Sequence, residues 1–467
     1  MHISSLPGKY SCGSFGAEAK EFIDFLSESG FSYWQVLPFC PVDECNSPYK
    51  SHSTFAGNPY FIDLDTLFKK GLITSDELKN AEQKSPYLCE FDRLEKERFP
   101  LLMNASKRVN DKEKVAEFIN NNPYIADFCR FMALKECNGF KRWQDWTEDN
   151  INSDVLFMWQ FIQYEFFTEW KEIKSYANGK GIEIIGDIPF YVSDDSADVW
   201  ANKEFFQLDK RNMPSMVAGV PPDYFSADGQ LWGNPLYDWD KMKENNYSWW
   251  VDRVKFMLEI FDGLRIDHFR AFESYWAVEA TEKTAKNGKW VKGPQMDLLK
   301  RFKEVAKDRL IIAEDLGIIT KEVEDLVEES TFPGMRVFQF GFFGGESTHM
   351  PHNYKNNCIA YTGTHDNNTL LGYLWELDDN TRREMLDYCG YTSSDWERGL
   401  FSMIRTIWAS NAGTAILTIQ DLLGYGSDTR LNYPGTSENN WRYRVTKDQI
   451  NSIDKAKFNK LNKMYYR

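Results

Sequence analysis

The chain has 467 residues, a formal net charge of −15 and a pI near 5.1, and 16% of its residues are aromatic. Nucleic-acid phosphates would be repelled by this charge, so a nucleic-acid partner is not expected. Core packing accounts for most of the aromatic residues. The remainder fits a neutral sugar substrate, because flat apolar faces stack on pyranose rings much as rings stack on other planar groups.

The cysteines and the apolar runs bear on compartment. Eight cysteines are scattered along the chain, and none lies in a CxxC pair or at a metal-site spacing beside His. We expect free buried thiols in a reducing compartment. No signal-peptide pattern opens the chain, and no apolar run of about 18 residues predicts a membrane segment. The sequence therefore predicts a cytoplasmic protein.

Short apolar runs bounded by turn residues predict buried parallel strands. In chain order they lie at 1–6, 33–38, 181–189, 263–267, 309–314, 335–340, 359–366 and 414–421. Most are followed by a helical pattern. Eight alternating strand–helix units predict an α/β fold with a closed (β/α)₈ barrel.

The spacing of these strands is uneven. Roughly 140 residues separate the second strand from the third, too many for one crossover helix. We interpret residues 62–180 as an inserted, mostly helical subdomain of a single catalytic barrel spanning 1–467. Residues 193–247 are interpreted as a second, loop-rich insertion with an active-site lid. Within it, 219–234 combines glycines, prolines and aromatics, which is typical of a mobile loop.

Three carboxylates close or follow predicted strands: Asp267, Glu314 and Asp366. A charge at the end of a buried strand is costly unless the site uses it. The carboxyl ends of barrel strands meet at one face, so we expect one acidic pocket. Acidic pockets of this kind cleave glycosidic bonds.

Local spacing suggests roles for two of these acids. Arg265 and Asp267 are two apart and share a strand face, so the arginine keeps the aspartate ionised, as a glycosyl nucleophile requires. The alternative is a buried ion pair that merely joins strands. Glu314, near another carboxylate and apolar neighbours, should hold its proton and suit a general acid. Asp315 turns away from Glu314, and we expect it to cap the following turn.

Asp366 follows His365 directly. This pair can grip two vicinal sugar hydroxyls, and such bonds strengthen as the ring flattens toward an oxocarbenium ion. The alternative for His365 is a structural histidine with satisfied hydrogen bonds.

Ordered motifs extend over nearly the whole chain. They are HISSLPG at 2–8, SPY at 47–49, FAGNP at 55–59, GDIP at 186–189, GVPPDYFS at 219–226, QLWGNP at 230–235, RIDHFR at 265–270, AEDLG at 313–317, GTHDN at 363–367, NYPGT at 432–436 and NW at 440–441. Together they resemble the amylomaltases, or disproportionating enzymes. These are 4-α-glucanotransferases of glycoside hydrolase family 77, built on a (β/α)₈ barrel.

The resemblance implies a role for each candidate residue. Asp267 would be the nucleophile, Glu314 the acid/base and Asp366 the transition-state stabiliser. Seven further residues would bind substrate: Arg265, His365 and Asp187 in the donor site, Tyr224, Phe225 and Trp232 on a loop over the acceptor side, and Tyr49 on a more distant glucan-binding surface. Packing against the barrel rim is the alternative for the aromatics. No metal or organic cofactor is implied.

The N-terminal region departs from the family pattern. Family members carry several more apolar residues before the 2–8 motif, so Met1 stands where the first strand should already be under way. Either the sequence begins late or the first strand is very short.

The expected activity is transfer of α-1,4-linked glucan segments from a donor to an acceptor maltooligosaccharide or glucose. It would proceed by retaining double displacement, with the two reacting carboxyl groups about 5 Å apart. A retaining α-glucan hydrolase of the amylase type would use the same carboxylates and differ on the acceptor side. A catalytically silent glucan-binding protein would share the aromatic surface but has no use for three aligned acids.

Overall fold

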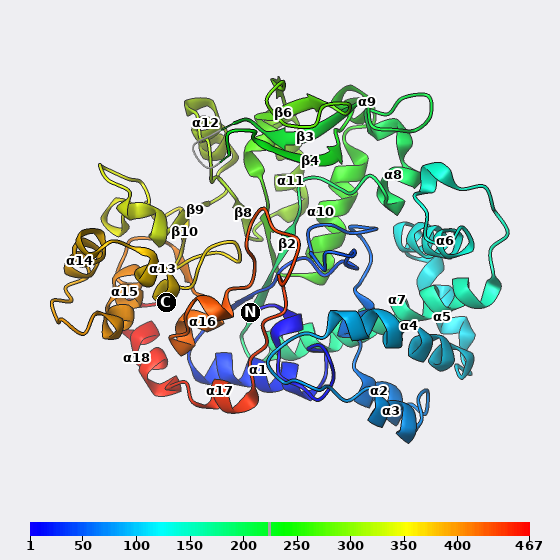
Figure 1. The fold of residues 1–467 in the computed structure, drawn as a ribbon, viewed down its shortest axis with the longest axis horizontal. Coiled ribbons are helices and arrows are strands. Elements are labelled where there is room, and N and C mark those ends of the chain that lie inside the picture. The colour runs from blue at the N-terminus through cyan, green and yellow to red at the C-terminus, as the bar shows by residue number, and fades with distance from the viewer. Residues whose placement is uncertain (223–225) are drawn as a thin grey trace.

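A curled parallel sheet lies at the centre of the computed structural model, which describes residues 1–222 and 226–467 (Figure 1). Each strand pairs with the next parallel strand along the chain, because the connections between them are long enough to return to the same edge. The seven strands, in spatial order, are β1 (Tyr33–Gln35), β2 (Glu183–Ile188), β5 (Gly263–Ile266), β8 (Ile311–Ala313), β9 (Gly334–Val337), β10 (Cys358–Tyr361) and β11 (Thr414–Ile416).

Amphipathic helices surround this sheet. In α12, for example, Val323 and Leu326 are buried at helical spacing, while Glu322 and Glu329 face solvent. The helices that follow or precede the strands are α1 (Ala17–Glu28), α7 (Ser153–Gly179), α10 (Ser248–Ile260), α11 (Gln295–Ala306), α12 (Lys321–Ser330), α13 (Leu370–Glu376), α14 (Asp379–Tyr388), α15 (Leu400–Trp408), α16 (Ile419–Leu423), α17 (Lys447–Asn451) and α18 (Lys455–Tyr465).

Strand alternation decides which side chains fill the interior of the sheet. Leu264 and Ile266 pack into the main core with the helices, whereas Arg265 points inward and its Nε donates to Met335 Sδ at 3.4 Å. An inner cluster contains Ile185, Ile312, Met335, Val337, Ile359 and Tyr361. Tyr361 Oη donates to Gln35 Oε1 at 3.0 Å, joining β10 to β1. The interior is therefore packed with side chains, and the site lies at its rim.

The strand predicted at residues 1–6 is wrong. Ile3–Ser5 is a 3₁₀-helix, η1. Its carbonyl groups accept hydrogen bonds from loops and not from a neighbouring strand. Ser4 O accepts from Gly13 N at 3.2 Å, and Ser5 O accepts from Val445 N at 3.0 Å. The residues before it still lie beside β1, because Trp34 Nε1 donates to Met1 O at 2.6 Å.

Six helices fill most of the chain between β1 and β2. They are α2 (Leu64–Lys69), α3 (Ser75–Asn80), α4 (Phe91–Lys107), α5 (Lys112–Asn120), α6 (Pro123–Cys137) and α7. Helices α4, α5 and α6 pack on α7, which also contacts α1 beside the sheet. Figure 1 shows α4–α6 on one side of the molecule and α13–α15 on the other.

A second, antiparallel sheet lies at one end of the molecule (top of Figure 1). Its order is β4 (Gln230–Pro235), β3 (Met216–Val220), β6 (Ser274–Glu279) and β7 (Lys289–Lys292). The segment 193–247 also contains α8 (Ala197–Ala201) and α9 (Trp239–Glu244). It therefore has more regular structure than a loop-rich interpretation predicts, and its strands pair with strands that follow β5.

Two further observations concern the whole chain. All eight cysteines are free thiols. Over residues 1–222 and 226–467, no helix combines the length and the apolar character needed to cross a membrane.

Candidate active site

Three strand ends bring the candidate acids to one rim of the parallel sheet. Asp267 follows β5, Glu314 follows β8, and Asp366 lies in the turn after β10. Asp267 N donates to Ile188 O at 2.9 Å. Asp267, the nucleophile candidate, therefore lies where the pairing between β2 and β5 ends. Parallel strands share their direction, and the carboxyl ends therefore gather these side chains as the sequence predicted.

Glu314 is bound by the backbone that follows Asp267. His268 N donates to Glu314 Oε2 at 2.7 Å, and Phe269 N donates to Glu314 O at 3.1 Å. His268 adopts the left-handed conformation, with φ of 50°, at this tight turn. Burial, reinforced by the charge of Asp267, raises the pKa of the Glu314 carboxyl well above its ordinary value. Glu314 therefore holds a proton beside a second carboxyl group.

Arg265 orients Asp267 and at the same time pairs with Asp187. Its Nη1 donates to both carboxylate oxygens of Asp187, at 2.9 and 2.7 Å, and its Nη2 donates to Asp267 Oδ1 at 2.9 Å. The Asp187 side chain is fully buried, whereas that of Asp267 is 32% exposed. One arginine thus pairs with a buried aspartate on the neighbouring strand and with a partly exposed aspartate at the end of its own strand.

Asp366 has a partner on each carboxylate oxygen. His365 Nε2 lies 3.3 Å from Oδ2, and Asn432 Nδ2 donates to Oδ1 at 2.6 Å. Burial alone would raise the pKa of this carboxyl, but His365 and Asn432 outweigh it and hold the pKa below its ordinary value. In turn, Asp366 raises the pKa of His365 against the effect of burial. Asp366 is therefore ionised and oriented.

Tyr49 lies in the same cluster, which corrects its placement on a distant surface. Its Oη donates to Asp187 Oδ2 at 2.8 Å, and its ring stacks on His365 with centroids 4.8 Å apart. Trp441 lies 6.0 Å from the Tyr49 ring and 5.8 Å from the His365 ring, centroid to centroid. The loop after β1 folds back over the sheet rim, so Tyr49 forms one wall of the site.

Of the three lid aromatics, only Trp232 can be placed. Its ring lies edge-on to His268, with centroids 4.9 Å apart, and 39% of the residue is exposed. Tyr224 and Phe225 lie outside the described residues. His268 directly follows Asp267 in the sequence, so Trp232 packs against the residue beside this candidate acid and remains partly exposed.

Two of our residue interpretations need revision. Asp315 is no turn cap: it accepts from Met335 N at 2.6 Å and Arg336 Nη1 at 2.9 Å, so it ties β8 to β9. Asn432 and Arg430, which bind Asp366, were not predicted as site residues. They occur in an irregular segment far along the chain, where the NYPGT motif begins at Asn432 but indicates no role for it.

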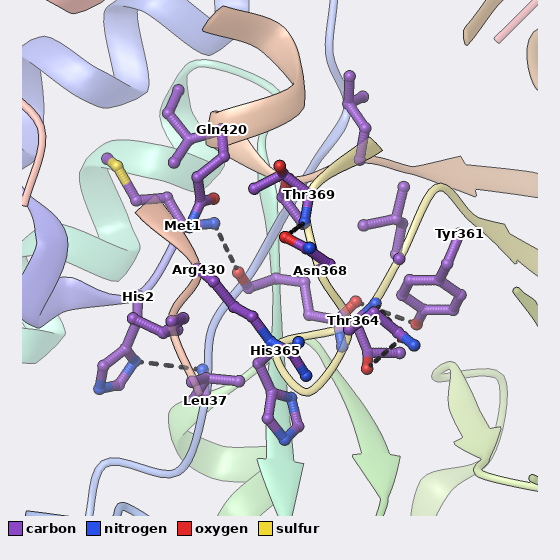
Figure 2. Close-up of a pocket in the computed structure, with 18 of the residues that line it drawn as sticks. Met1, His2, Leu37, Tyr361, Thr364, His365, Asn368, Thr369, Gln420 and Arg430 are labelled. Carbon is purple, nitrogen blue, oxygen red and sulfur yellow. Dashed lines mark hydrogen bonds between the residues drawn. The ribbon is translucent and has the colours of Figure 1, made fainter. Parts of the chain in front are cut away.

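A cavity of about 100 Å³ lies beside the site (Figure 2). Arg265, Tyr361, His365 and Arg430 contribute to its lining, together with apolar residues that include Met1 and Leu37. Asp267, Glu314 and Asp366 do not line it. The cavity therefore adjoins Arg265 and His365 but does not include the three acids.

The arrangement separates two carboxyl groups by protonation state. Asp267 is accessible and bound by a guanidinium, while Glu314 is buried and protonated. One oriented carboxylate and one protonated acid at a shared rim form the pair that retaining glycosidic bond cleavage requires. Asp366 adds a second ionised carboxylate beside them.

Comparisons with known proteins agree with this geometry. A family model described as 4-alpha-glucanotransferase matches residues 1–450. A curated 4-alpha-glucanotransferase of Clostridium butyricum is 44% identical over 489 residues, covering 100% of both chains. Another, from Streptococcus pneumoniae, is 42% identical over 473 residues and covers 96% of this chain and 93% of its own.

Solved structures give the same result. The amylomaltase from Streptococcus agalactiae, in complex with acarbose, superposes with a TM-score of 0.95 at 38% identity, covering 100% of this chain and 98% of that one. The amylomaltase from Corynebacterium glutamicum, at 15% identity, shares the fold with a TM-score of 0.81 over 99% of this chain and 74% of its own.

Proposed function

This chain belongs to the 4-alpha-glucanotransferase family, and on that premise we propose that Asp267, Glu314 and Asp366 transfer α-1,4-linked glucan segments between maltooligosaccharides. The observation that supports this most strongly is the unequal pair of carboxyl groups at the rim. Arg265 donates a hydrogen bond to Asp267. Glu314 accepts a hydrogen bond from His268 N, in the turn after Asp267, and its raised pKa favours the protonated form.

In the first step, Asp267 attacks the anomeric carbon of the donor while Glu314 protonates the departing glycosidic oxygen. The bond from carbon to the leaving oxygen breaks, and an ester to the Asp267 carboxylate forms. Arg265 keeps Asp267 ionised and oriented for this attack. The leaving portion departs with a neutral hydroxyl because it has received the Glu314 proton.

In the second step, the 4-hydroxyl of an acceptor sugar attacks the glycosyl-enzyme. Glu314, now a carboxylate, accepts the hydroxyl proton, and the ester bond to Asp267 breaks. Two inversions at one carbon give net retention. The carboxylate of Asp366, with His365, binds ring hydroxyls of the donor sugar, and these bonds strengthen as the ring flattens.

Arg265, Asp187 and Tyr49 complete the donor wall, and Trp232 supplies an acceptor surface. A sugar stacked on Trp232 would lie next to His268 and therefore next to Asp267. Such occupancy favours transfer because it displaces the water that would otherwise hydrolyse the glycosyl-enzyme. A glucan hydrolase would instead need water to reach the glycosyl-enzyme more readily than an acceptor sugar does. We place Tyr224 and Phe225 on the same acceptor side by family resemblance.

Incubation with maltotriose tests the proposal. Transfer gives glucose together with chains longer than maltotriose, whereas hydrolysis gives glucose and maltose with no longer chains. The matched control is Asp267→Asn, which keeps the shape of the side chain but cannot form the ester. Absence of longer chains from the folded wild-type protein would refute transfer, and near-native activity of Asp267→Asn would refute the nucleophile.

The finer architecture is also proposed. We infer that the parallel sheet belongs to a (β/α)₈ barrel in which residues 1–6 occupy the place of a first strand, since Met1 lies between β1 and β11 in the cavity lining. Residues 62–180 form the helical insertion and 193–247 the lid-bearing one. Eight free thiols fit a reducing compartment, and we propose the cytoplasm.

A further inference from the structure

Two irregular segments meet at Asp366. One is the turn after β10, residues 362–369, and the other is residues 430–433, which belong to no helix or strand. Asn368 of the first segment donates to Ser427 Oγ at 2.9 Å, just before the second segment, and Asn432 of the second segment binds the Asp366 carboxylate itself. Arg430 lies between them and lines the cavity together with His365 (Figure 2).

Arg430 bonds to the main chain of both segments. Its Nη2 donates to Asp366 O at 2.5 Å, and its Nε donates to Asn432 O at 2.8 Å. Its guanidinium carbon lies 4.5 Å from the centroid of the Tyr433 ring. A guanidinium is planar and its donors form a rigid fork, so two carbonyl oxygens bound by one fork are held at a fixed separation.

That separation determines whether Asn432 reaches Asp366. Asn432 Nδ2 donates to Asp366 Oδ1 at 2.6 Å, while His365 occupies the other oxygen. The carbonyl of Asn432 is the same group that Arg430 holds. Releasing it would let the amide move away from the carboxylate, and Asp366 could then rotate about its own side-chain bonds.

We propose that Arg430 is a positioning residue for the reaction, acting through Asn432 to fix the carboxylate of Asp366. It touches Asp366 only at the main chain, away from the oxygens that would bind sugar. The inference rests on the proposed role of Asp366. A carboxylate whose hydroxyl contacts strengthen in the transition state loses most of its effect when displaced, and a displacement of about 1 Å costs on the order of 10²-fold in rate.

The experiment follows fluoride release from α-maltotriosyl fluoride, which reports formation of the glycosyl-enzyme whatever its later fate. Arg430→Ala should lower kcat about 100-fold and change KM much less, because the lost interaction belongs to the transition state. Asn432→Ala should show the same pattern. The matched control is Arg442→Ala, since Arg442 lies in the same C-terminal region and its guanidinium pairs with the exposed Asp92 at 3.3 Å, away from Asp366.

One readout separates positioning from a general loss of structure. Millimolar guanidinium chloride should restore part of the rate of Arg430→Ala, because the free ion can occupy the same two carbonyls, and it should not restore Asn432→Ala.

Two outcomes would overturn the inference: Arg430→Ala within about twofold of wild type, or a slow Arg430→Ala that guanidinium does not restore. Failure of the proposed function would look different. A wild-type protein that releases fluoride but makes no longer chains contradicts transfer, and it leaves the comparison of Arg430→Ala with wild type intact.

Discussion

Asp267 and Glu314 are both carboxyl groups, yet their surroundings give them different tasks. Asp267 is partly exposed and faces a guanidinium, whereas Glu314 is buried and accepts hydrogen bonds from His268 N and Leu316 N. The charge of Asp267 and the burial together raise the pKa of Glu314. Neither task requires an unusual residue, because the environment alone assigns them.

Glu314→Gln tests this assignment. Gln cannot donate a proton to a leaving sugar, so turnover of maltotriose should fall on the order of 10²–10⁴-fold. Fluoride release from a glycosyl fluoride should be largely spared because fluoride leaves without protonation. The two rates are compared in one assay series, and equal losses on both substrates would show that Glu314 is not the acid.

The carboxyl group of Glu314 also sets the upper pH limit of turnover. The first step needs protonated Glu314, so wild-type turnover of maltotriose should be lost as pH rises through its raised pKa. Fluoride release from a glycosyl fluoride needs no proton from Glu314, so the wild-type profile for that substrate should lack this basic limb.

Trp232→Ala should change the fate of the glycosyl-enzyme more than its formation. Stacking at one aromatic ring is worth on the order of 1 kcal/mol, a several-fold change in acceptor occupancy. Hydrolysis relative to transfer on maltotriose should therefore rise several-fold while total turnover falls. The control is Trp375→Ala, an exposed tryptophan on α13. An unchanged ratio in Trp232→Ala would make Trp232 a structural or donor-side residue.

At the scale of elements, β2 packs closely against the end of α10 because residue 186 is a glycine and has no side chain. A Cβ added at Gly186 would lie 2.2 Å from Phe261 Cδ2, and Phe261 is buried at the end of α10. Gly186 therefore lets the strand that carries Asp187 approach the helix closely.

Gly186→Ala should destabilise the fold by about 1–3 kcal/mol, because overpacking shifts the strand or the ring. Thermal unfolding measures the effect. Gly179→Ala is the matched control: Gly179 ends α7, just before β2, with no atom within 4 Å of an added Cβ. A control variant as unstable as Gly186→Ala would remove the packing explanation.

The strands were predictable because each joins an apolar run to a turn, and the acids were predictable because a charge that ends such a run stands out. Tyr49 was misplaced because its loop has no period, and only its bond to Asp187 shows where it lies. The prediction of a strand at residues 1–6 was wrong because carbonyl groups of η1 accept hydrogen bonds from Gly13 N and Val445 N and not from a neighbouring strand. The antiparallel sheet combines β3 and β4 with β6 and β7, a pairing across β5 that no local pattern encodes.

At the scale of the whole molecule, the C-terminal segment closes onto the N-terminal loop. Arg444 is completely buried, and its guanidinium donates to Tyr10 O at 2.6 Å and Leu6 O at 3.1 Å, and also to Gln83 Oε1. Ser5 Oγ donates to Tyr443 O at 2.7 Å. Contacts between the two ends of the sequence thus stabilise the folded protein.

Arg444→Ala should lower the free energy of unfolding by on the order of 3 kcal/mol, because it leaves buried carbonyl oxygens without donors. Denaturant unfolding measures this loss, and Arg442→Ala, which removes a half-buried arginine two residues earlier, is the control. Activity well below the new melting temperature should persist, since Arg444 does not contact the acids. Equal stability of the two variants would contradict the role assigned to Arg444.

The position of Arg430 and Asn432 so late in the chain has a consequence for synthesis. A ribosome builds the strand ends bearing Asp267, Glu314 and Asp366 first, and residues 430–433 leave the exit tunnel only afterwards. Until they emerge, Asp366 cannot form its bonds with Arg430 and Asn432. The surroundings of Asp366 are therefore the last part of the site to be completed during synthesis.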